Sequence, residues 1–280
     1  MSNQGPFFAL WVCGVALALT MAFGCGNTFP DYSAQLFAVP LAIEDEPIGS
    51  AVVDTGGGYE IMLSDSFGLD VVDSAEVVAF GGRRLVDVTE GFTYTAGGVD
   101  TSTHAAIVGD SITNHNAIGF HFFRKTGIVL GIDFADPTVV FLSRAPSEGI
   151  TVDFDPLPAH LATFDTSFIE VEILENGRSH AILALLDTGA SATMLRRSFV
   201  SSPISRLLDR IPINVTHRKL GSVSIDAALF EDAHLPDMIL GTDIMKVWGE
   251  SWYFSYESRA GSVTVIRDDD SSDASEVPHL

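Results

Sequence analysis

The segment SAVVDTGGGYEIML, residues 50–63, recurs in outline as AILALLDTGASATML, residues 181–195. Each copy is an apolar run followed by Asp-Thr-Gly, and the two aspartates are Asp54 and Asp187. Apolar runs of this length, bounded by turn residues, are typical of buried strands. An aspartate directly after such a strand lies on a tight loop, where the strand can hold its carboxylate in a fixed position.

The rest of the chain also indicates strands. Of its 280 residues 46% are hydrophobic, which is enough for one large core or two small ones. Helical periodicity is weak, since the best segment, residues 196–211, is interrupted by Pro203. We therefore expect an all-β protein.

The charge balance excludes one class of partner. The chain has 15 Lys and Arg against 37 Asp and Glu, a net charge of −22. A protein so acidic repels the phosphate backbone of DNA and RNA. We expect no nucleic-acid partner.

The N-terminus has the pattern of an export segment. Residues 1–24 carry no charged side chain and include an apolar run from Phe7 to Phe23. The sequence Ala-Phe-Gly-Cys that ends at Cys25 resembles a bacterial lipobox, in which the cysteine is acylated and becomes the mature N-terminus. We expect a signal peptide over residues 1–24, lipidation at Cys25, and a lipoprotein of the bacterial cell envelope, on the periplasmic side or at the outer membrane. An uncleaved anchor and a plain cleaved signal peptide are the alternatives.

Composition shifts divide the chain further. A stretch near the middle with three prolines and no long apolar run indicates a boundary between two parts, and the end of the chain is acidic and polar. The expected divisions are a tether at 25–33, an N-terminal lobe at 34–146, an interlobe linker at 147–163, a C-terminal lobe at 164–267 and an acidic disordered tail at 268–280.

The two parts repeat one pattern. In each, the apolar Asp-Thr-Gly segment is followed later by two apolar residues and a glycine, which we place at Gly131 and Gly241. This pattern resembles the two lobes of the aspartic-protease superfamily, both pepsin-like and retropepsin-like. The resemblance implies a bilobal pepsin-like (acid protease) fold, in which two related β lobes flank a central cleft and each lobe contributes one aspartate.

The resemblance also implies the chemistry of the site. Asp54 and Asp187 are the expected catalytic residues, because two carboxyl groups about 3 Å apart cannot both ionise and share one proton. Such a pair titrates as a unit and can activate a water molecule to hydrolyse a peptide bond. The expected supports of the two catalytic loops are Thr55, Gly56, Thr188, Gly189 and Ser191. The threonines would hydrogen-bond across to the opposite loop, and the glycines would allow the backbones to approach.

One position differs between the two motifs. The second half has Ser191 where the family places a hydroxyl that bonds the carboxylate, whereas the first half has Gly58. A carboxylate that lacks a donor holds its proton more tightly. This asymmetry predicts that Asp54 holds the shared proton.

A substrate-covering hairpin is expected in the first half. Residues 91–103 read GFTYTAGGVDTST, two β-rich runs around a pair of glycines. We expect this hairpin to form a flap, with Tyr94 and Gly97 as substrate-binding residues. The alternative is an ordinary surface hairpin whose tyrosine packs on the sheet.

Other patterns are weaker. His104, His115 and His121, with Asp110 between them, lack the spacing of a metal-binding pair. Ser191 lacks the G-x-S-x-G frame of a nucleophile. We expect no metal and no cofactor, a protein or peptide substrate, a membrane contact through a lipid anchor or the N-terminal segment, and a monomer.

The sequence therefore predicts an aspartic-type endopeptidase, a hydrolase that acts outside the cytoplasm. The alternatives are a catalytically weak, protease-like, peptide-binding lipoprotein of the cell envelope and a structural envelope lipoprotein in which the two aspartates are incidental turn residues. Two Asp-Thr-Gly motifs favour the enzyme, because binding alone does not require two ionisable groups face to face.

The lipobox can be tested at Cys25. Cys25→Ser should release the protein from the membrane fraction or stall its processing, because the acylated thiol is lost. The measurement is fractionation of cells, with the size of the product on a gel. A variant that stays in the membrane at unchanged size would show an anchor instead of a lipidated cysteine.

Overall fold

The structure is a computed structural model that describes residues 37–79, 82–109, 115–156, 166–232, 234–256 and 261–267. The expected signal peptide, Cys25, the tether, Asp110 and the acidic tail all lie outside the described residues. Within the described part of the chain, no helix is long and apolar enough to cross a membrane.

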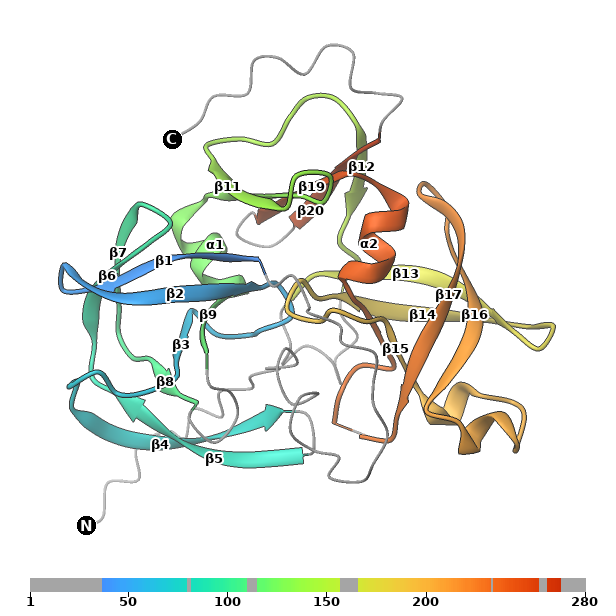
Figure 1. Cartoon of the computed structure of the whole chain (residues 1–280), viewed down its shortest axis with the longest axis horizontal. Coiled ribbons are helices and arrows are strands. Elements are labelled where there is room, and N and C mark those ends of the chain that lie inside the picture. The colour runs from blue at the N-terminus through green and yellow to red at the C-terminus, as the bar shows by residue number, and fades with distance from the viewer. Residues whose placement is uncertain are drawn as a thin grey trace.

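The N-terminal lobe is a nine-stranded sheet with the strand order β4-β5-β8-β3-β9-β2-β1-β6-β7 (Figure 1). At its centre, residues 51–54 of β2 and its parallel neighbour β9 are buried on both faces, as is typical of parallel strands. The strands are β1 (Ala38–Ile43), β2 (Glu46–Asp54), β3 (Ile61–Leu63), β4 (Val71–Ala79), β5 (Gly82–Thr89), β6 (Phe92–Ala96), β7 (Val99–Thr103), β8 (Ile107–Val108) and β9 (Asn116–Gly119).

The C-terminal lobe is a closed barrel of six strands in the order β13-β14-β18-β15-β17-β16. Buried and exposed residues alternate along β13 and β16, because successive side chains of a strand point to opposite faces. The strands are β13 (Phe168–Glu175), β14 (Arg178–Leu186), β15 (Met194–Arg196), β16 (Arg210–His217), β17 (Gly221–Phe230) and β18 (Met238–Leu240).

A third sheet joins the two lobes. Its order is β11-β10-β19-β20-β12, and its central antiparallel pair takes β10 from the first half and β19 from the second. Figure 1 shows this sheet above the lobes. A short strand within the expected interlobe linker, β12, forms its edge beside β20. The strands are β10 (Val129–Asp133), β11 (Thr138–Leu142), β12 (Ile150–Asp153), β19 (Ser251–Tyr256) and β20 (Gly261–Ile266).

The described residues contain two short helices, one in each half, which the sequence pattern did not indicate: α1 (Phe120–Thr126) and α2 (Thr242–Trp248). Helix α1 ends at Gly127, whose φ of 70° is left-handed and whose N–H caps Phe123. At seven residues each, neither helix shows three turns of periodicity. The segment with the best helical pattern contains only the 3-10 turns η2 (Arg197–Phe199) and η3 (Ser205–Leu207).

The predicted all-β, bilobal, pepsin-like fold class is confirmed. The halves repeat one order of elements: β2, β9, α1, β10 and β11 in the first, and β14, β18, α2, β19 and β20 in the second. In each half the strand before the helix runs parallel to the strand that carries Asp-Thr-Gly.

One landmark of the repeat was placed wrongly. In the pair β2–β9, Asp54 lies opposite Gly119, so Gly119 and not Gly131 corresponds to Gly241 after β18. Gly131 lies in β10 of the joining sheet. Two apolar residues precede both glycines, and spacing alone does not choose between them.

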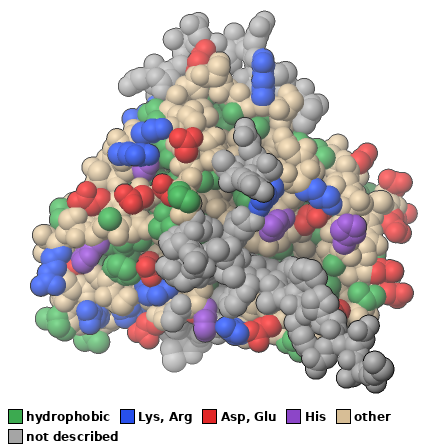
Figure 2. All heavy atoms as spheres, turned by 180° about the vertical axis from the view of Figure 1, so that it is seen from behind, with side chains coloured by type: hydrophobic (Ala, Val, Ile, Leu, Met, Phe, Trp, Pro, Cys, Tyr) green, Lys and Arg blue, Asp and Glu red, His purple; other side chains and the backbone are tan. Residues whose placement is uncertain are grey.

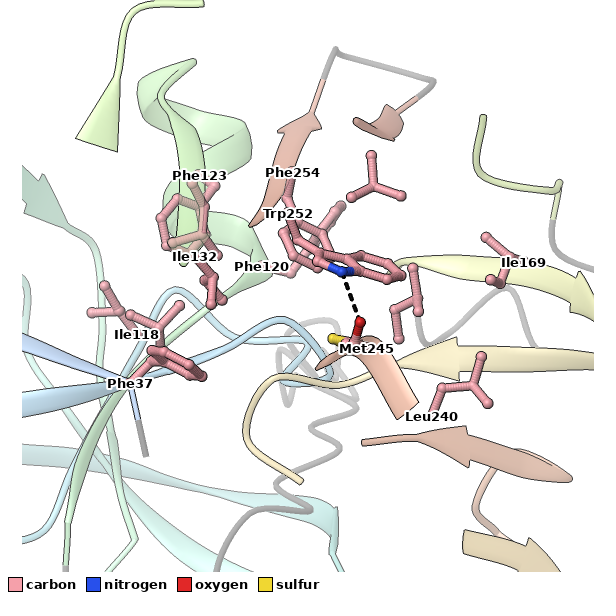
Figure 3. Close-up of a cluster of buried hydrophobic side chains, with 14 of the residues drawn as sticks. Phe37, Ile118, Phe120, Phe123, Ile132, Ile169, Leu240, Met245, Trp252 and Phe254 are labelled. Atoms are coloured by element: carbon pink, nitrogen blue, oxygen red, sulfur yellow. Dashed lines mark hydrogen bonds between the residues drawn. The ribbon is translucent and has the colours of Figure 1, made fainter. Parts of the chain in front are cut away.

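The main core continues from one lobe into the other. It includes Phe123 and Ile118 from the first half and Trp252, Phe254 and Leu240 from the second. Figure 3 shows these side chains together between the lobes and the joining sheet. The indole N–H of buried Trp252 donates to the carbonyl of Met245 at 3.0 Å, which ties α2 to β19. The lobes therefore share one apolar interior.

The face of the molecule seen in Figure 2 carries charged side chains of both signs. On the face in Figure 2, Lys and Arg side chains lie between Asp and Glu side chains. Such interspersion differs from the basic stripe that tracks a nucleic-acid backbone. The expectation about nucleic acid stays a prediction.

The corrected landmark gives a stability test. A Cβ on Gly119 would lie 2.4 Å from the carbonyl oxygen of Tyr59 and 2.6 Å from that of Gly57, both backbone atoms of the Asp54 loop. A Cβ on Gly131 would meet only the side chains of Val140 and Tyr253. Gly119→Ala should lower the free energy of unfolding by about 2 to 4 kcal/mol, and Gly131→Ala by less than about 1.5 kcal/mol.

Urea unfolding of both variants measures this difference. The φ of Gly119 is −99°, which alanine adopts freely, so any loss reports the close approach and not backbone strain. Equal losses, or a larger loss at Gly131, would contradict the corrected repeat.

Candidate active site

The two Asp-Thr-Gly loops meet between the lobes. Asp54 is the last residue of β2, and Asp187 follows directly after β14. Both strands are held at this end by a parallel neighbour, with Val53 opposite Ile118 and Leu186 opposite Leu240. Both aspartate side chains are 0% exposed. The equivalent strands β2 and β14 thus position the two carboxyl groups at one buried site.

Two threonines join the loops by four hydrogen bonds. The Thr55 hydroxyl donates to the carbonyl of Leu186 at 2.9 Å and accepts from the Thr188 N–H at 3.0 Å. The Thr188 hydroxyl donates to the carbonyl of Val53 at 2.8 Å and accepts from the Thr55 N–H at 3.1 Å. These are the cross-loop bonds that the sequence analysis expects of Thr55 and Thr188, and they fix one lobe against the other.

The glycines of the two motifs donate hydrogen bonds to the carboxyl groups. The Gly56 N–H donates to Asp54 Oδ1 at 3.0 Å, and the Gly189 N–H donates to Asp187 Oδ1 at 2.8 Å. A Cβ on Gly56 would lie 2.5 Å from the carboxyl carbon of Asp187. Only glycine at position 56 therefore leaves room for the opposite carboxyl group.

The support of the two carboxylates differs from the expectation. Asp54 does not lack a donor, because the hydroxyl of Tyr59 donates to Asp54 Oδ2 at 2.7 Å. In the described part of the chain, Asp187 Oδ2 accepts no hydrogen bond, so the expected bond from Ser191 is not formed. A phenol one residue beyond Gly58 thus replaces the missing hydroxyl.

The sequence contains this tyrosine, but a motif comparison position by position does not find it. In the order of the repeat Tyr59 corresponds to Ala192, not to Ser191. Its ring reaches the carboxylate because Gly57 and Gly119 lack side chains. Only the folded loop shows that the hydroxyl faces Asp54.

The electrostatics of the pair follow from this arrangement. Burial raises the pKa of Asp187 well above its usual value, and the neighbouring Asp54 carboxyl raises it further. Burial also raises the pKa of Asp54, but hydrogen bonds from Tyr59 and Asp187 and from Gly57 and Gly56 oppose that rise. The hydrogen bonds therefore favour the charged form of Asp54 over that of Asp187, which is the opposite of the expectation from Gly58.

Tyr94 and Gly97 are not brought to the aspartates. Residues 92–103 form the predicted hairpin, β6 and β7, but Tyr94 is 2% exposed and its ring packs between Phe92 and Phe122. Its hydroxyl donates to Glu60 at 2.9 Å. A Cβ on Gly97 would touch the ring of Phe141. The flap interpretation is corrected, since this hairpin packs into the core of its lobe.

A second hydrogen-bond network, which the sequence did not indicate, fixes the end of the Asp187 loop. Asp243, in the first turn of α2, accepts the Thr193 hydroxyl at 2.7 Å and the Thr193 N–H at 2.9 Å. The Thr193 hydroxyl in turn accepts the N–H of Gly241 at 3.3 Å. This chain of bonds ties the end of the Asp187 loop to the strand and helix beneath it. Neither residue belongs to the quoted motif.

The described residues contain no group of three or more His, Cys, Asp or Glu side chains that could hold a metal ion. His104 and His115 lie exposed in the part of the first lobe before β9, and His121 lies in α1. The site consists of the chain's own carboxyl, hydroxyl and backbone groups.

Comparison with known proteins adds two solved structures. No family model and no curated protein matches the chain. The chain is similar to the crystal structure of basic 7S globulin from soybean, with 10% identity, a TM-score of 0.49, and coverage of 83% of this chain and 92% of that one. It is also similar to conglutin gamma, a basic 7S globulin from lupine seeds, with 7% identity, a TM-score of 0.47, and coverage of 84% and 96%.

These comparisons correct one expectation. The motifs resemble the aspartic-protease superfamily, but recognition of the chain as a member of that superfamily is wrong. No family model supports it, and the solved structures named above are seed globulins. Any function must therefore be argued from the geometry of the site.

The threonine bonds predict a strong effect on stability. Thr188→Val leaves the Val53 carbonyl and the Thr55 N–H buried without partners, and an unsatisfied buried polar group costs about 1 to 3 kcal/mol. We expect a loss of about 2 to 4 kcal/mol in the free energy of unfolding. Thr188→Ser keeps the hydroxyl and is the matched control, with a loss below about 1.5 kcal/mol.

Denaturant unfolding of both variants provides the measurement. Equal losses in the valine and serine variants would show that the methyl group matters and that the cross-loop bonds contribute nothing.

Proposed function

We propose that the chain is an aspartic endopeptidase, which hydrolyses peptide bonds with a water molecule activated between Asp54 and Asp187. One observation supports this most strongly: two wholly buried carboxyl groups lie on facing loops, and the threonine bonds fix both loops. Burying two like charges together is costly, and structural turns do not require it. Such an arrangement is typical of a site that uses the proton the pair retains.

The reaction needs one proton on the pair. The Asp54 carboxylate takes a proton from water as the water oxygen bonds to the peptide carbonyl carbon. The Asp187 carboxylic acid gives its proton to the carbonyl oxygen, so that a neutral tetrahedral intermediate forms. Asp54 then protonates the amide nitrogen as the C–N bond breaks, and the hydroxyl proton of the new carboxyl group returns to Asp187. The pair ends in its starting state.

The fixed surroundings support this chemistry. Carboxyl groups held by short hydrogen bonds and excluded from solvent do not need to reorient as charge develops. The partner proposed is a protein or peptide, and the proposed location is outside the cytoplasm, with a membrane contact through Cys25 or the leader. The protein would act as a monomer, because both aspartates come from one chain.

A second candidate function is peptide binding at the same site. A peptide-binding protein that cleaves weakly or not at all is favoured by the complete burial of both carboxyl groups, since a substrate meets them only after the surroundings rearrange. Binding without hydrolysis separates this function from the first.

Asn substitutions test the catalytic roles. Asp54→Asn and Asp187→Asn should each lower cleavage of a peptide mixture to less than about 1% of the wild-type rate, because an amide cannot share the proton. The double variant should be no slower than either single one, since the two groups act as a unit. Asp153→Asn, at an exposed residue of β12, is the matched control and should keep full activity.

The experiment is mass spectrometry of the products, with fluorescence anisotropy of labelled peptides run in parallel. More than a few per cent of the activity in either single variant removes that residue from the mechanism. If the wild type binds peptides without cleaving them, the endopeptidase proposal is overturned and the peptide-binding function is supported.

A further inference from the structure

The two halves are built alike beneath their catalytic loops. The carbonyl of Gly57 accepts the N–H of Phe120 at 3.0 Å, and the carbonyl of Ala190 accepts the N–H of Thr242 at 2.8 Å. In each half, this hydrogen bond joins the residue three positions after the aspartate of the motif to the first residue of the helix. This correspondence places Tyr59 opposite Ala192. The carboxyl groups thus sit in equivalent frames with one large difference between them.

The Tyr59 ring is fixed in place. It is 2% exposed and packs with Val52, Met62 and Ala117 in a small apolar cluster. A Cβ on Gly57 would lie 2.5 Å from ring atom Cε1, so the loop glycine leaves the space that the ring fills. The Tyr59 carbonyl also accepts the N–H of His121 at 3.1 Å. The Tyr59 side chain is therefore rigidly held while its hydroxyl contacts Asp54.

We propose that Tyr59 is the positioning residue that makes the pair unequal: its hydroxyl, held on Asp54 Oδ2, fixes Asp54 as the carboxylate that activates water and leaves Asp187 as the acid. A donor to a carboxylate stabilises the charged form. Asp187 Oδ2 has no corresponding donor in the described part of the chain. The catalytic consequence rests on the proposed function, whereas the effect on ionisation does not.

The groups that face Asp54 agree with this role. They are Asp187 on the opposite loop, Tyr59 on its own loop and Tyr256 on β19. Burial and the charge of Asp54 raise the pKa of Tyr59 well above its usual value, so the phenol stays protonated and remains a donor. Tyr256 instead shares a hydrogen bond of 2.8 Å with Ser167. Tyr59 is the tyrosine that bonds Asp54.

Ionisation of the pair can be followed without substrate. Protein labelled with ¹³C at the aspartate carboxyl carbons is titrated by NMR, and Asp54→Asn and Asp187→Asn assign the two signals. In the wild type the first proton should leave Asp54. Tyr59→Phe removes only the hydroxyl and should raise this first apparent pKa by about half a unit to one unit. The second ionisation should stay in place, because Asp54 is charged before and after it.

The matched control is Tyr253→Phe, which removes the same atom from a partly exposed tyrosine of β19 and should move neither ionisation. First ionisation at Asp187 in the wild type overturns the proposal, even if Tyr59→Phe fails to fold. A folded Tyr59→Phe with an unmoved first ionisation overturns it as well.

Activity gives a separate readout. For an active wild type, the acid limb of the rate against pH should move to higher pH in Tyr59→Phe by the same amount, with the alkaline limb unchanged. A merely structural role would lower the rate at every pH and leave the limbs in place. A wild type that cleaves no peptide contradicts the proposed function, and the NMR titration still decides the role of Tyr59.

Discussion

Four buried hydrogen bonds between Thr55 and Thr188 and the opposite backbones hold the protein's two halves in register. Each threonine supplies a donor to one carbonyl and an acceptor for one N–H, so the exchange is reciprocal. Because no water competes at this depth, losing one hydroxyl would leave two backbone groups unsatisfied. The position of the two aspartates relative to each other depends on this contact, together with the joining sheet and the core that the lobes share.

The same contact brings together two groups that repel each other when charged. Folding therefore encloses a pair of carboxyl groups that retains a proton, and the surroundings decide which member retains it. Because the backbones of the two loops are nearly symmetric, the side chains around them determine which carboxyl group retains the proton. Tyr59 bonds Asp54, while the equivalent place beside Asp187 holds Ala192. In the proposed mechanism, this difference of one side chain assigns the roles of base and acid.

The sequence predicts the repeat and the all-β class, because these follow from short local patterns, whereas the threonine bonds were expected only from the resemblance of the two motifs to known proteins. It misplaced the first landmark, since both Gly119 and Gly131 follow two apolar residues and only strand pairing separates them. It also placed Tyr94 on a flap, because a hairpin pattern does not tell which face packs on Phe122. Tyr59 was missed for a related reason: a long side chain can reach a carboxylate from outside the motif. Family membership expected from the motifs was wrong, and the function rests on geometry alone.

The central claim is that Asp54 and Asp187 share one proton, with Asp187 as the acid. A crystal structure at atomic resolution measures this directly, because the two C–O bonds of a carboxylate are equal and those of a carboxylic acid are not. The account predicts carboxyl oxygens of the two residues about 3 Å apart, equal C–O bonds in Asp54 and unequal bonds in Asp187. Carboxyl groups separated by more than about 6 Å, or equal C–O bonds in both residues, would contradict it.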